Sequence, residues 1–223
     1  MRRKKPIVIT IDGPAGAGKT TVSRILADRL GFRYIDTGAL YRGIALAAKE
    51  QGISSDDDSA LEEMCRYLSL RFELISNRLK LFSGDRDITE LIRTPEITMM
   101  ASAVSARPVV RRFLLDLQRE IGMEKQVVFE GRDMGTVVFP DAEVKFFLDA
   151  SPRTRAVRRF NEMKNSSSQT LEEVERDIVQ RDSNDSTRAV APLKPAEDAI
   201  RIDTTALSLE EVVTIMLKAV EKA

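Results

Sequence analysis

Short apolar runs alternate with amphipathic segments along most of the chain. Five of the runs are rich in valine, isoleucine and phenylalanine, a composition typical of strands that are buried on both faces. These runs occupy residues 7–11, 32–35, 126–129, 144–148 and 199–202. Because segments with helical spacing separate them, the pattern predicts a parallel sheet with helices that connect the strands and cover the sheet.

Local signals predict where several helices begin and end. Val22, Ile25 and Leu26 have helical spacing after the first run, and Gly31 stands where a glycine commonly ends a helix. Further helix starts are predicted by two capping boxes, Thr170 with Glu173 and Ser208 with Glu211, and by the first-turn prolines Pro108 and Pro152.

The alternation of strands and helices is interrupted between residues 52 and 94. Two apolar runs, 70–75 and 79–82, flank Ser76 and Asn77 in this part of the chain. A turn-forming pair between two such runs predicts a β-hairpin. We interpret the hairpin as an insert carried by the main sheet rather than as an independent domain, because it interrupts the alternation of strands and helices.

The composition limits the classes of protein to which the chain can belong. Its 223 residues are 43% hydrophobic, which suits one compact domain with an insert or two small domains. The 35 basic and 35 acidic residues cancel, so no overall charge attracts the chain to nucleic acid or to a membrane surface. No run of eighteen apolar residues occurs, and we therefore expect no membrane span. One cysteine and no histidine exclude a disulfide framework and a clustered thiolate zinc site, which favours a cytoplasmic protein.

A glycine-rich motif joins the first predicted strand to the first predicted helix. Residues 13–20 match the pattern G-x-x-x-x-G-K-[ST] at every fixed position. Backbone N–H groups and the helix N-terminus would surround phosphate oxygens, Lys19 would reach the outer phosphates, and Thr20 would hold Mg²⁺. A chance glycine turn would not need this strand and helix around it. The predicted triphosphate-binding residues are Gly13, Pro14, Ala15, Gly16, Ala17, Gly18, Lys19, Thr20 and Thr21.

Arginines are frequent where a second anionic substrate would have to approach a triphosphate. Arg155, Arg158 and Arg159 lie at i, i+3 and i+4 on one predicted helix face, beside the polar stretch 165–168. This spacing places cations on a mobile loop or lid, where they would stabilise charge on a transferred phosphoryl group. A solvated helix face with acidic partners explains the same spacing, so these arginines alone leave both interpretations open.

Gly131, Arg132 and Asp133 directly follow the third predicted strand. The carboxyl edge of an open parallel sheet is where such folds bind their ligands. Charged residues in this place can also simply cap the strand, and the position alone does not separate the two possibilities.

Longer strings across the chain resemble the bacterial cytidylate kinases, a branch of the nucleoside monophosphate kinase family. They are residues 11–14, 36–42, 131–142, 147–150, 181–182, 185 and 188–193. The resemblance implies a P-loop NTPase-type three-layer α/β fold with a five-stranded parallel sheet flanked by helices. It implies one kinase domain over residues 1–223 with three parts. These are a core at about 1–36, 106–151 and 190–223, a monophosphate-binding region with the small β insert at about 37–105, and a helical lid at about 152–189.

The resemblance also implies an activity and a set of site residues. The activity is transfer of the γ-phosphoryl group of ATP to CMP or dCMP, with Mg²⁺ bound alongside ATP, by a cytoplasmic monomer that uses neither nucleic acid nor membrane. The residues implied on the CMP side are Thr37, Tyr41, Arg42, Ser102, Arg111, Arg132, Asp133, Arg181, Asp185 and Arg188. Those implied in catalysis are Lys19, Arg132, Arg155, Arg158 and Arg159, with Thr20 as the metal ligand.

The choice of base can be argued from hydrogen-bonding chemistry. Among the implied cytosine readers, Asp133 can accept from the 4-amino group and Arg111 can donate to a ring acceptor. Uracil has a carbonyl oxygen in place of the amino donor and an N3 donor in place of the ring acceptor. Each mispaired contact should therefore weaken the binding of UMP by about 1 to 3 kcal/mol.

Three other functions fit parts of the sequence. A P-loop kinase for adenylate, thymidylate or a non-nucleotide acceptor would have the same phosphate loop but not the strings after the second and third strands. A nucleotide-dependent switch would not need arginines around a second site. A nucleic-acid-binding module is the weakest alternative, because the net charge is +0 and aromatic residues make up only 5% of the chain.

Overall fold

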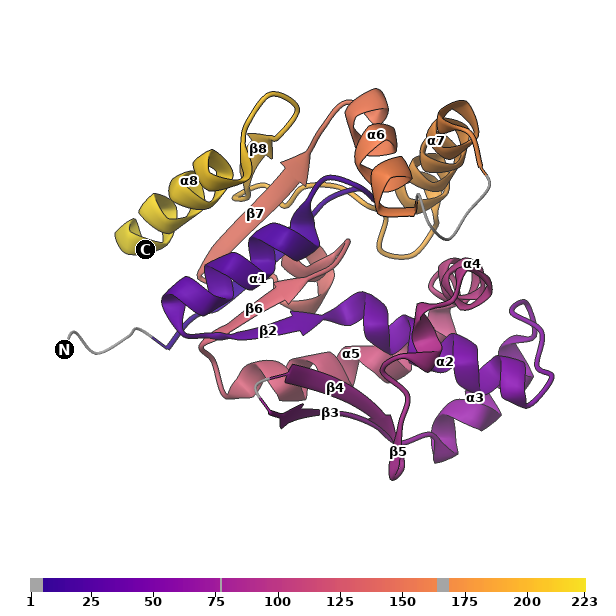
Figure 1. Ribbon diagram of the computed structural model, residues 1–223. Helices are drawn as coiled ribbons and strands as arrows, with labels where there is room; N and C mark the ends of the chain where they lie inside the picture. The colour runs from indigo at the N-terminus through magenta and orange to yellow at the C-terminus, as the bar shows by residue number, and fades with distance from the viewer. Residues whose placement is uncertain (1–5, 77, 164–168) are drawn as a thin grey trace. The chain divides into compact units, whose positions relative to one another are not determined.

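The structure is a computed structural model that describes residues 6–76, 78–163 and 169–223 (Figure 1). The chain divides into two compact units. The first unit comprises Met1–Tyr34 and Glu124–Ala223, and the second comprises Ile35–Met123.

A five-stranded parallel sheet with the order β2-β6-β1-β7-β8 confirms the predicted sheet. Its strands are β1 (Val8–Asp12), β2 (Arg33–Asp36), β6 (Val127–Glu130), β7 (Val144–Asp149) and β8 (Ile200–Asp203). Each lies within one residue of a predicted run at both ends. The central strand β1 is buried along its whole length, with Ile9 opposite Val128 on one side and Val144 on the other. Apolar side chains can fill both faces of such a strand, which explains its unbroken hydrophobic sequence.

Two helices of the first unit pack on one face of this sheet (Figure 1). They are α1 (Lys19–Leu30) and α8 (Leu209–Lys222), and their side chains Leu26 and Val213 share a buried cluster with Ile9 and Phe146. Gly31 ends α1 in the left-handed conformation, with φ of 62°, as predicted for a glycine at that position. The capping box of Ser208 and Glu211 at the start of α8 is also confirmed.

A helical pair follows β7. Helix α6 (Pro152–Met163) begins at the predicted proline, and α7 (Leu171–Thr187) begins after Thr170, whose predicted capping box with Glu173 is confirmed. The two helices pack through a small apolar cluster that contains Ala156, Val174 and Ile178. The predicted loop tip 165–168 lies outside the described residues.

The second unit has its own helices, sheet and core. Its helices are α2 (Thr37–Glu50), α3 (Asp58–Tyr67), η1 (Leu91–Arg93), α4 (Pro95–Val104) and α5 (Pro108–Met123). The predicted hairpin is confirmed as β3 (Leu70–Ile75) and β4 (Arg78–Ser83), although Asn77 of its turn is outside the described residues. A short third strand, β5 (Arg86–Asp87), was not predicted, because two exposed charged residues carry no strand pattern. Leu40, Ile44, Leu61, Leu81 and Leu114 are among the fully buried core residues of this unit.

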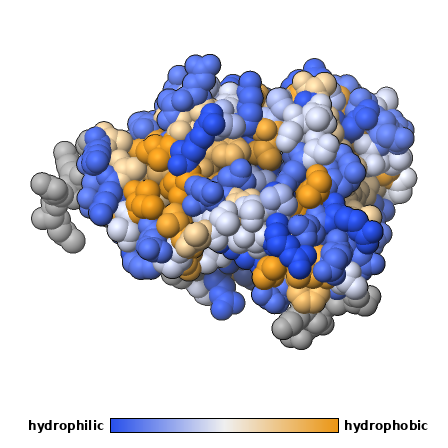
Figure 2. Space-filling model, turned by 90° about the horizontal axis from the view of Figure 1, so that it is seen from above, coloured by the Kyte–Doolittle hydropathy of each residue, from blue (hydrophilic) through white to orange (hydrophobic). Residues whose placement is uncertain are grey.

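The surface mixes apolar and charged side chains. In the view from above, an apolar area is bordered by strongly hydrophilic side chains (Figure 2). Exposed apolar residues of β8 and α8 include Ile200, Leu209 and Ile215. None of the helices in the described part of the chain is long and apolar enough to cross a membrane.

Candidate functional site

The glycine-rich motif forms a tight loop between β1 and α1. Gly13 has φ of 145°, and a Cβ atom there would lie 2.0 Å from the carbonyl oxygen of Leu148. Gly16 has φ of 77°, and its Cβ would lie 2.9 Å from the Cβ of Arg155. Both positions therefore require glycine for conformation and for space. The loop leads into the N-terminus of α1, where backbone N–H groups and the helix dipole favour an anion.

Lys19 is buried at the first position of α1. Its side chain is 4% exposed, and Nζ donates a 2.7 Å hydrogen bond to the carbonyl oxygen of Pro14. Burial, together with the positive charges of Arg132 and Arg181, lowers the pKa of Lys19 to about 7, against the opposing effects of Glu130 and Asp12. A cationic group that is destabilised in this way gains from the arrival of an anion, so the local electrostatics suit phosphate binding.

Thr20 is linked to a buried carboxylate that the sequence did not identify. The Thr20 hydroxyl donates to Oε1 of Glu130 at 2.8 Å, and the Tyr34 hydroxyl donates to Oε2 of the same side chain at 2.5 Å. Glu130 is 8% exposed and is the last residue of β6. The sequence offered one signal for Glu130. A carboxylate at the carboxyl end of a predicted buried strand lies at the sheet edge where the phosphate loop also begins.

These oxygen atoms suit a hard cation. Mg²⁺ prefers oxygen ligands and commonly keeps several waters, so it needs few protein ligands beyond the phosphates. The exposed Thr20 hydroxyl beside Glu130 meets that requirement. Within residues 6–76, 78–163 and 169–223, no three histidine, cysteine, aspartate or glutamate side chains are grouped to hold a metal ion by themselves.

The three arginines of α6 have different environments. Arg155 is 3% exposed and donates to the carbonyl oxygens of Ala150, at 2.8 Å, and Ala15, at 3.2 Å. It also forms a 2.6 Å ion pair with Asp182, so it connects α7 to the phosphate loop.

Arg158 donates to the hydroxyl and the carbonyl oxygen of Thr204, at 3.0 and 2.7 Å. Arg159 is exposed and pairs with Glu162 at 3.2 Å. Of the three predicted cations, two therefore lie near the phosphate loop or the end of β8, and the third lies on the surface of α6.

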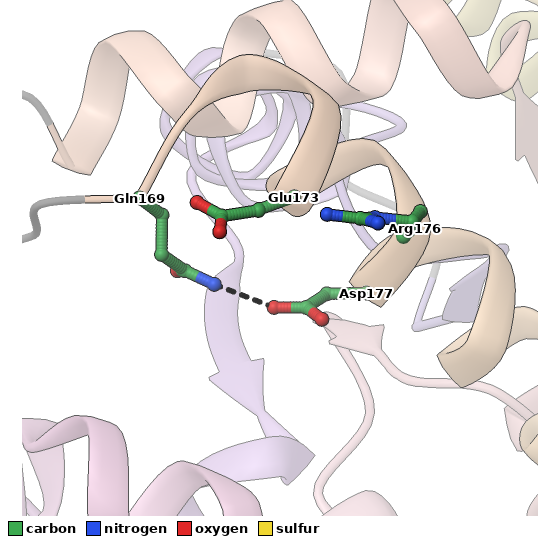
Figure 3. Close-up of a pocket in the computed structure, with 4 residues that line it drawn as sticks. All are labelled: Gln169, Glu173, Arg176 and Asp177. Carbon is green, nitrogen blue, oxygen red and sulfur yellow. Dashed lines mark hydrogen bonds between the residues drawn. The ribbon is translucent and has the colours of Figure 1, made fainter.

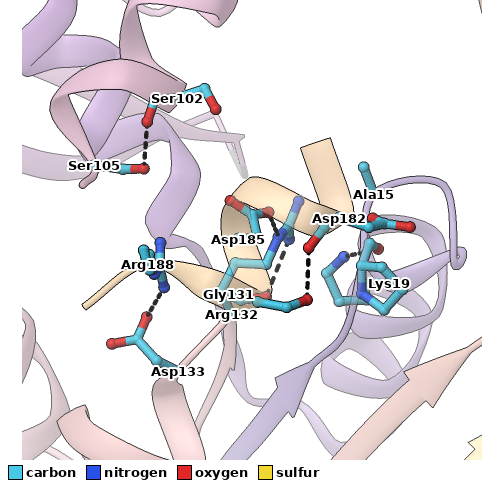
Figure 4. A network of polar contacts seen from close by, with 12 residues as sticks. Ala15, Lys19, Ser102, Ser105, Gly131, Arg132, Asp133, Asp182, Asp185 and Arg188 are labelled. Atoms are coloured by element: carbon cyan, nitrogen blue, oxygen red, sulfur yellow. Dashed lines mark hydrogen bonds and ion pairs between the residues drawn. The ribbon is translucent and has the colours of Figure 1, made fainter. Parts of the chain in front are cut away.

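Two ion pairs bring together four predicted CMP-side residues of the first unit (Figure 4). Arg132 donates through Nε to Asp185 at 3.0 Å, and Arg188 lies 3.6 Å from Asp133. Asp133 and the Arg188 side chain are only 2% and 7% exposed. Arg188 also donates to the carbonyl oxygen of Ala191 at 2.6 Å, which fixes the direction of its guanidinium group. Arg181, which is half-buried, contributes its charge around Lys19.

The remaining predicted CMP-side residues belong to the second unit. The guanidinium carbon of Arg111 lies 5.6 Å from the ring centroid of Tyr41, and Arg111 donates to the carbonyl oxygen of Ser105 at 3.1 Å. Ser105 in turn donates its hydroxyl to the carbonyl oxygen of Ser102 at 2.8 Å (Figure 4). The structure therefore brings Tyr41, Ser102 and Arg111 into one connected group.

Thr37 and Arg42 lie at the start of α2 in the same unit. Thr37 is 2% exposed, and Arg42 forms a 2.7 Å ion pair with Asp36, the last residue of β2. A Cβ atom on Gly38 would lie 3.0 Å from Oδ1 of Asp36 and 3.2 Å from Nη1 of Arg42, so the absence of a side chain at residue 38 makes room for this ion pair.

A separate cavity of about 430 Å³ lies at the start of α7 (Figure 3). Gln169, Glu173, Arg176 and Asp177 line it, and Gln169 donates to Asp177 at 2.7 Å. None of these side chains belongs to the predicted site.

Comparisons with known proteins agree with this geometry. The family model "Cytidylate kinase" matches residues 9–222. A cytidylate kinase of Geobacter sp. (strain M21) is 48% identical over 221 residues, which are 99% of this chain and 95% of that protein. A cytidylate kinase of Thermosipho melanesiensis is 50% identical over 218 residues, or 97% of this chain and 98% of that protein.

Solved structures are similar in fold. A gluconokinase from Sinorhizobium meliloti 1021 superimposes with a TM-score of 0.52 at 15% identity, covering 99% of this chain and 94% of that one. This likeness shows the α/β fold alone and nothing about the activity or the acceptor. The family model and the full-length relatives are more specific, and by them this chain belongs to the cytidylate kinase family.

Proposed function

We propose that this protein transfers the γ-phosphoryl group of ATP to CMP, giving CDP and ADP. The observation that carries the proposal is the arrangement at the carboxyl edge of the sheet. The phosphate loop with buried Lys19 leaves β1, and Arg132 and Asp133 leave the neighbouring strand β6. A triphosphate site and a set of ion-paired arginines therefore begin on adjacent strands, as a kinase for a phosphorylated acceptor requires.

The chemistry follows from charge. An anionic oxygen of the CMP phosphate attacks the γ-phosphorus, and the bond between that phosphorus and the β,γ-bridging oxygen breaks, so that ADP leaves with the electron pair. The attacking oxygen is already deprotonated, and no general base is needed, which is consistent with a chain that contains no histidine. Catalysis then rests on positioning and on cations that stabilise charge in the transition state.

The two ion pairs, of which Arg188 with Asp133 is buried and Arg132 with Asp185 is partly exposed, suit the binding of CMP. Arg132 and Arg188 are held by Asp185 and Asp133 before substrate arrives. The anionic phosphate of CMP would offer Arg132 a new partner of similar charge, and the neutral 4-amino group of cytosine would donate to the carboxylate of Asp133 beside Arg188. Charges that are already ordered by such pairs lose little freedom on binding, which favours a preorganised site.

The cofactor follows from the same site. The Thr20 hydroxyl, oriented by Glu130, would hold Mg²⁺ together with oxygen atoms of ATP and water. The ion would neutralise charge on the β- and γ-phosphates when it is bound.

Several further points belong to this proposal. Residues of about 37–105 serve as the monophosphate-binding region, and those of about 152–189 serve as a lid whose cations are Arg155, Arg158 and Arg159. The protein also accepts dCMP and acts as a cytoplasmic monomer. These points are supported by the family relationship and by the separate helical pair α6 and α7.

The test is ADP formation from ATP and Mg²⁺ with CMP, dCMP, UMP, AMP or no acceptor. We expect the highest kcat/KM with CMP, activity with dCMP, and only a basal rate without acceptor. Lys19→Ala should abolish transfer while circular dichroism of the folded chain is retained. A CMP rate no higher than the acceptor-free rate would overturn the proposal, and faster turnover with AMP would favour a kinase with a different acceptor.

A further inference from the structure

Asp12 connects the two halves of the site within the first unit. It is the last residue of β1, directly before Gly13, and its side chain is 4% exposed. One carboxylate oxygen accepts the N–H of Met134 at 2.9 Å, and the other accepts the N–H of Gly135 at 2.8 Å. These amides directly follow Arg132 and Asp133 in the sequence. The strand that carries the phosphate loop therefore holds the turn that carries two predicted acceptor-side residues.

The turn is fitted closely around this carboxylate. A Cβ atom on Gly135 would lie 3.0 Å from Oγ1 of Thr10, 3.2 Å from Cδ of Lys145 and 3.4 Å from Oδ2 of Asp12. The chain then enters η2 (Met134–Val138), a π-helical turn of the kind that often occurs at functional sites.

Within this turn, the N–H groups of Val137 and Val138 both point to the carbonyl oxygen of Asp133, at 2.9 and 3.2 Å. The backbone around Asp133 is therefore held from two sides. The Asp12 carboxylate holds the two amides that follow it, and the N–H groups of Val137 and Val138 hold its carbonyl oxygen.

The residue type at position 12 has a chemical reason. Two backbone N–H donors point at the side chain, and only a carboxylate offers one acceptor oxygen to each. An asparagine would place its NH₂ group against the second donor. Burial, with a smaller contribution from the charge of Asp133, raises the pKa of Asp12 to about 6 against the opposing effects of the two amides and, more weakly, of Lys19. Burial of a carboxylate at this position costs free energy. An apolar side chain would avoid that cost if the position served only for packing.

We propose that Asp12 is a positioning residue, which holds Arg132 and Asp133 in register with the phosphate loop and so aligns the acceptor with ATP. Its action is through the turn at Met134 and Gly135. The inference rests on the proposed function, since it assigns Arg132 and Asp133 to the acceptor.

The main test is the Asp12→Asn variant, in which the kinetics with the acceptor and the binding of the donor ATP are measured separately. Loss of one charge-assisted hydrogen bond should raise the KM for CMP about tenfold and reduce the preference for CMP over UMP several-fold. The dissociation constant of ATP, measured calorimetrically without acceptor, should change by less than about threefold, because Asp12 is the smallest of the influences on the pKa of Lys19. Amide exchange of the peptide 131–139 should become faster.

Two further variants make the result specific. Gly135→Ala displaces the same turn without changing Asp12 or the phosphate loop, and it should reproduce the acceptor-side changes. Asp203→Asn is the matched control, because Asp203 also ends a parallel strand and accepts a backbone N–H, from Thr205 at 2.8 Å, but is exposed. It should leave the KM for CMP, the preference for CMP over UMP, the dissociation constant of ATP and the exchange of peptide 131–139 as in the parent protein. If Asp12→Asn does not fold, Gly135→Ala carries the test.

The outcomes separate this inference from the proposed function. If the parent protein does not use CMP, the proposed function fails, and unchanged exchange of peptide 131–139 would additionally overturn the structural role of Asp12. If the parent protein uses CMP, the inference is overturned when the folded Asp12→Asn variant keeps the KM for CMP and the CMP preference. It is also overturned when ATP and CMP binding weaken equally, because Asp12 would then maintain the site as a whole.

Discussion

Asp133 lies 3.6 Å from Arg188 and is almost fully buried, so any ligand group that reaches it must share the carboxylate with this arginine. An amino group can do so, since a carboxylate has lone pairs for several donors. A carbonyl oxygen cannot, because it brings a second acceptor to a site that already holds one. The pair therefore gives a physical reason why cytosine should be preferred at this position over uracil.

The Asp133→Ala variant tests this reason. We expect kcat/KM for CMP to fall by an amount that corresponds to about 1 to 3 kcal/mol of lost transition-state stabilisation, and kcat/KM for UMP to fall much less. The ratio of kcat/KM for CMP to kcat/KM for UMP should therefore decrease about tenfold or more. Steady-state kinetics with both acceptors measure the ratio. Asp141→Ala, an exposed aspartate on the same connection before β7, is the control and should leave the ratio unchanged. An unaltered ratio in Asp133→Ala would remove this residue from base recognition.

Tyr34 shares the carboxylate of Glu130 with the hydroxyl of Thr20, the proposed metal ligand. Its hydroxyl donates to the carboxylate at 2.5 Å, and Arg24 lies over its ring, 5.4 Å from the centroid. Removal of the hydroxyl leaves Glu130 with one hydrogen-bond donor fewer, and a hydrogen bond to a charged group contributes about 1.5 to 3 kcal/mol.

The Tyr34→Phe variant should therefore weaken metal binding in the presence of ATP by a few-fold. Direct titration with Mn²⁺, followed by its magnetic resonance signal, measures this independently of turnover. Tyr67→Phe is the matched control, since Tyr67 is 82% exposed. Equal metal affinity in Tyr34→Phe and the parent protein would show that Glu130 does not depend on this hydroxyl.

At the scale of elements, most boundaries could be predicted because the signals are local. Strand β1 is a continuous apolar run, and Gly31 and the boxes at Thr170 and Ser208 act within one helical turn. Strand β5 could not be predicted, because it consists of Arg86 and Asp87, whose pairing with β4 depends on the hairpin that precedes them.

The candidate site could be predicted only in part for a related reason. The phosphate loop is a contiguous motif, and its residues lie together whatever the rest of the chain does. The pairs Arg132 with Asp185 and Arg155 with Asp182 join residues that are far apart in the sequence. Such partners are decided by tertiary packing, and the links from Asp12 to Met134 and from Thr20 to Glu130 were missed for the same reason.

The capping box of α7 gives a prediction for a whole element. The Thr170 hydroxyl accepts from the N–H of Glu173 at 3.3 Å, and the Glu173 carboxylate accepts from the N–H of Thr170 at 2.7 Å. Thr170→Ala should cost about 0.5 to 2 kcal/mol and loosen the first turn of α7. Hydrogen exchange of the peptide 169–176 should become faster, whereas that of α8 should not change. Ser208→Ala is the reciprocal control, with the effect expected in α8 instead.

At the scale of the whole molecule, the net charge of +0 conceals a strongly uneven arrangement. Lys19 is buried in the first unit near Arg132 and Arg181, although many arginines and carboxylates elsewhere form exposed pairs such as Arg29 with Glu210. Exposed pairs contribute little to stability, about 0 to 1 kcal/mol each. A buried lysine next to other cations opposes folding, so the phosphate site lowers the stability of the protein that carries it.

The destabilisation of the folded protein by buried Lys19 should depend on pH, and the pKa of Lys19 determines the direction. The pKa of Lys19 is about 7 in the folded protein and 10.5 for an ordinary lysine, which represents the unfolded chain. Between these values the unfolded chain therefore binds more protons than the folded protein. The free energy of unfolding should therefore rise with pH from about 7 toward 10.5, and the full penalty should be present below pH 7.

Lys19→Met removes the buried charge and keeps a side chain of similar length. Its thermal midpoint should exceed that of the parent protein by several degrees at pH 6, since about 1 kcal/mol corresponds to about 2 to 4 °C in a chain of this size. The difference should shrink as the pH rises above 7. Lys218→Met, at an exposed position of α8, controls for the loss of one positive charge. A difference that stays constant from pH 6 to pH 9 would mean that Lys19 is not strained by its surroundings, and the electrostatic account of phosphate binding would lose its basis.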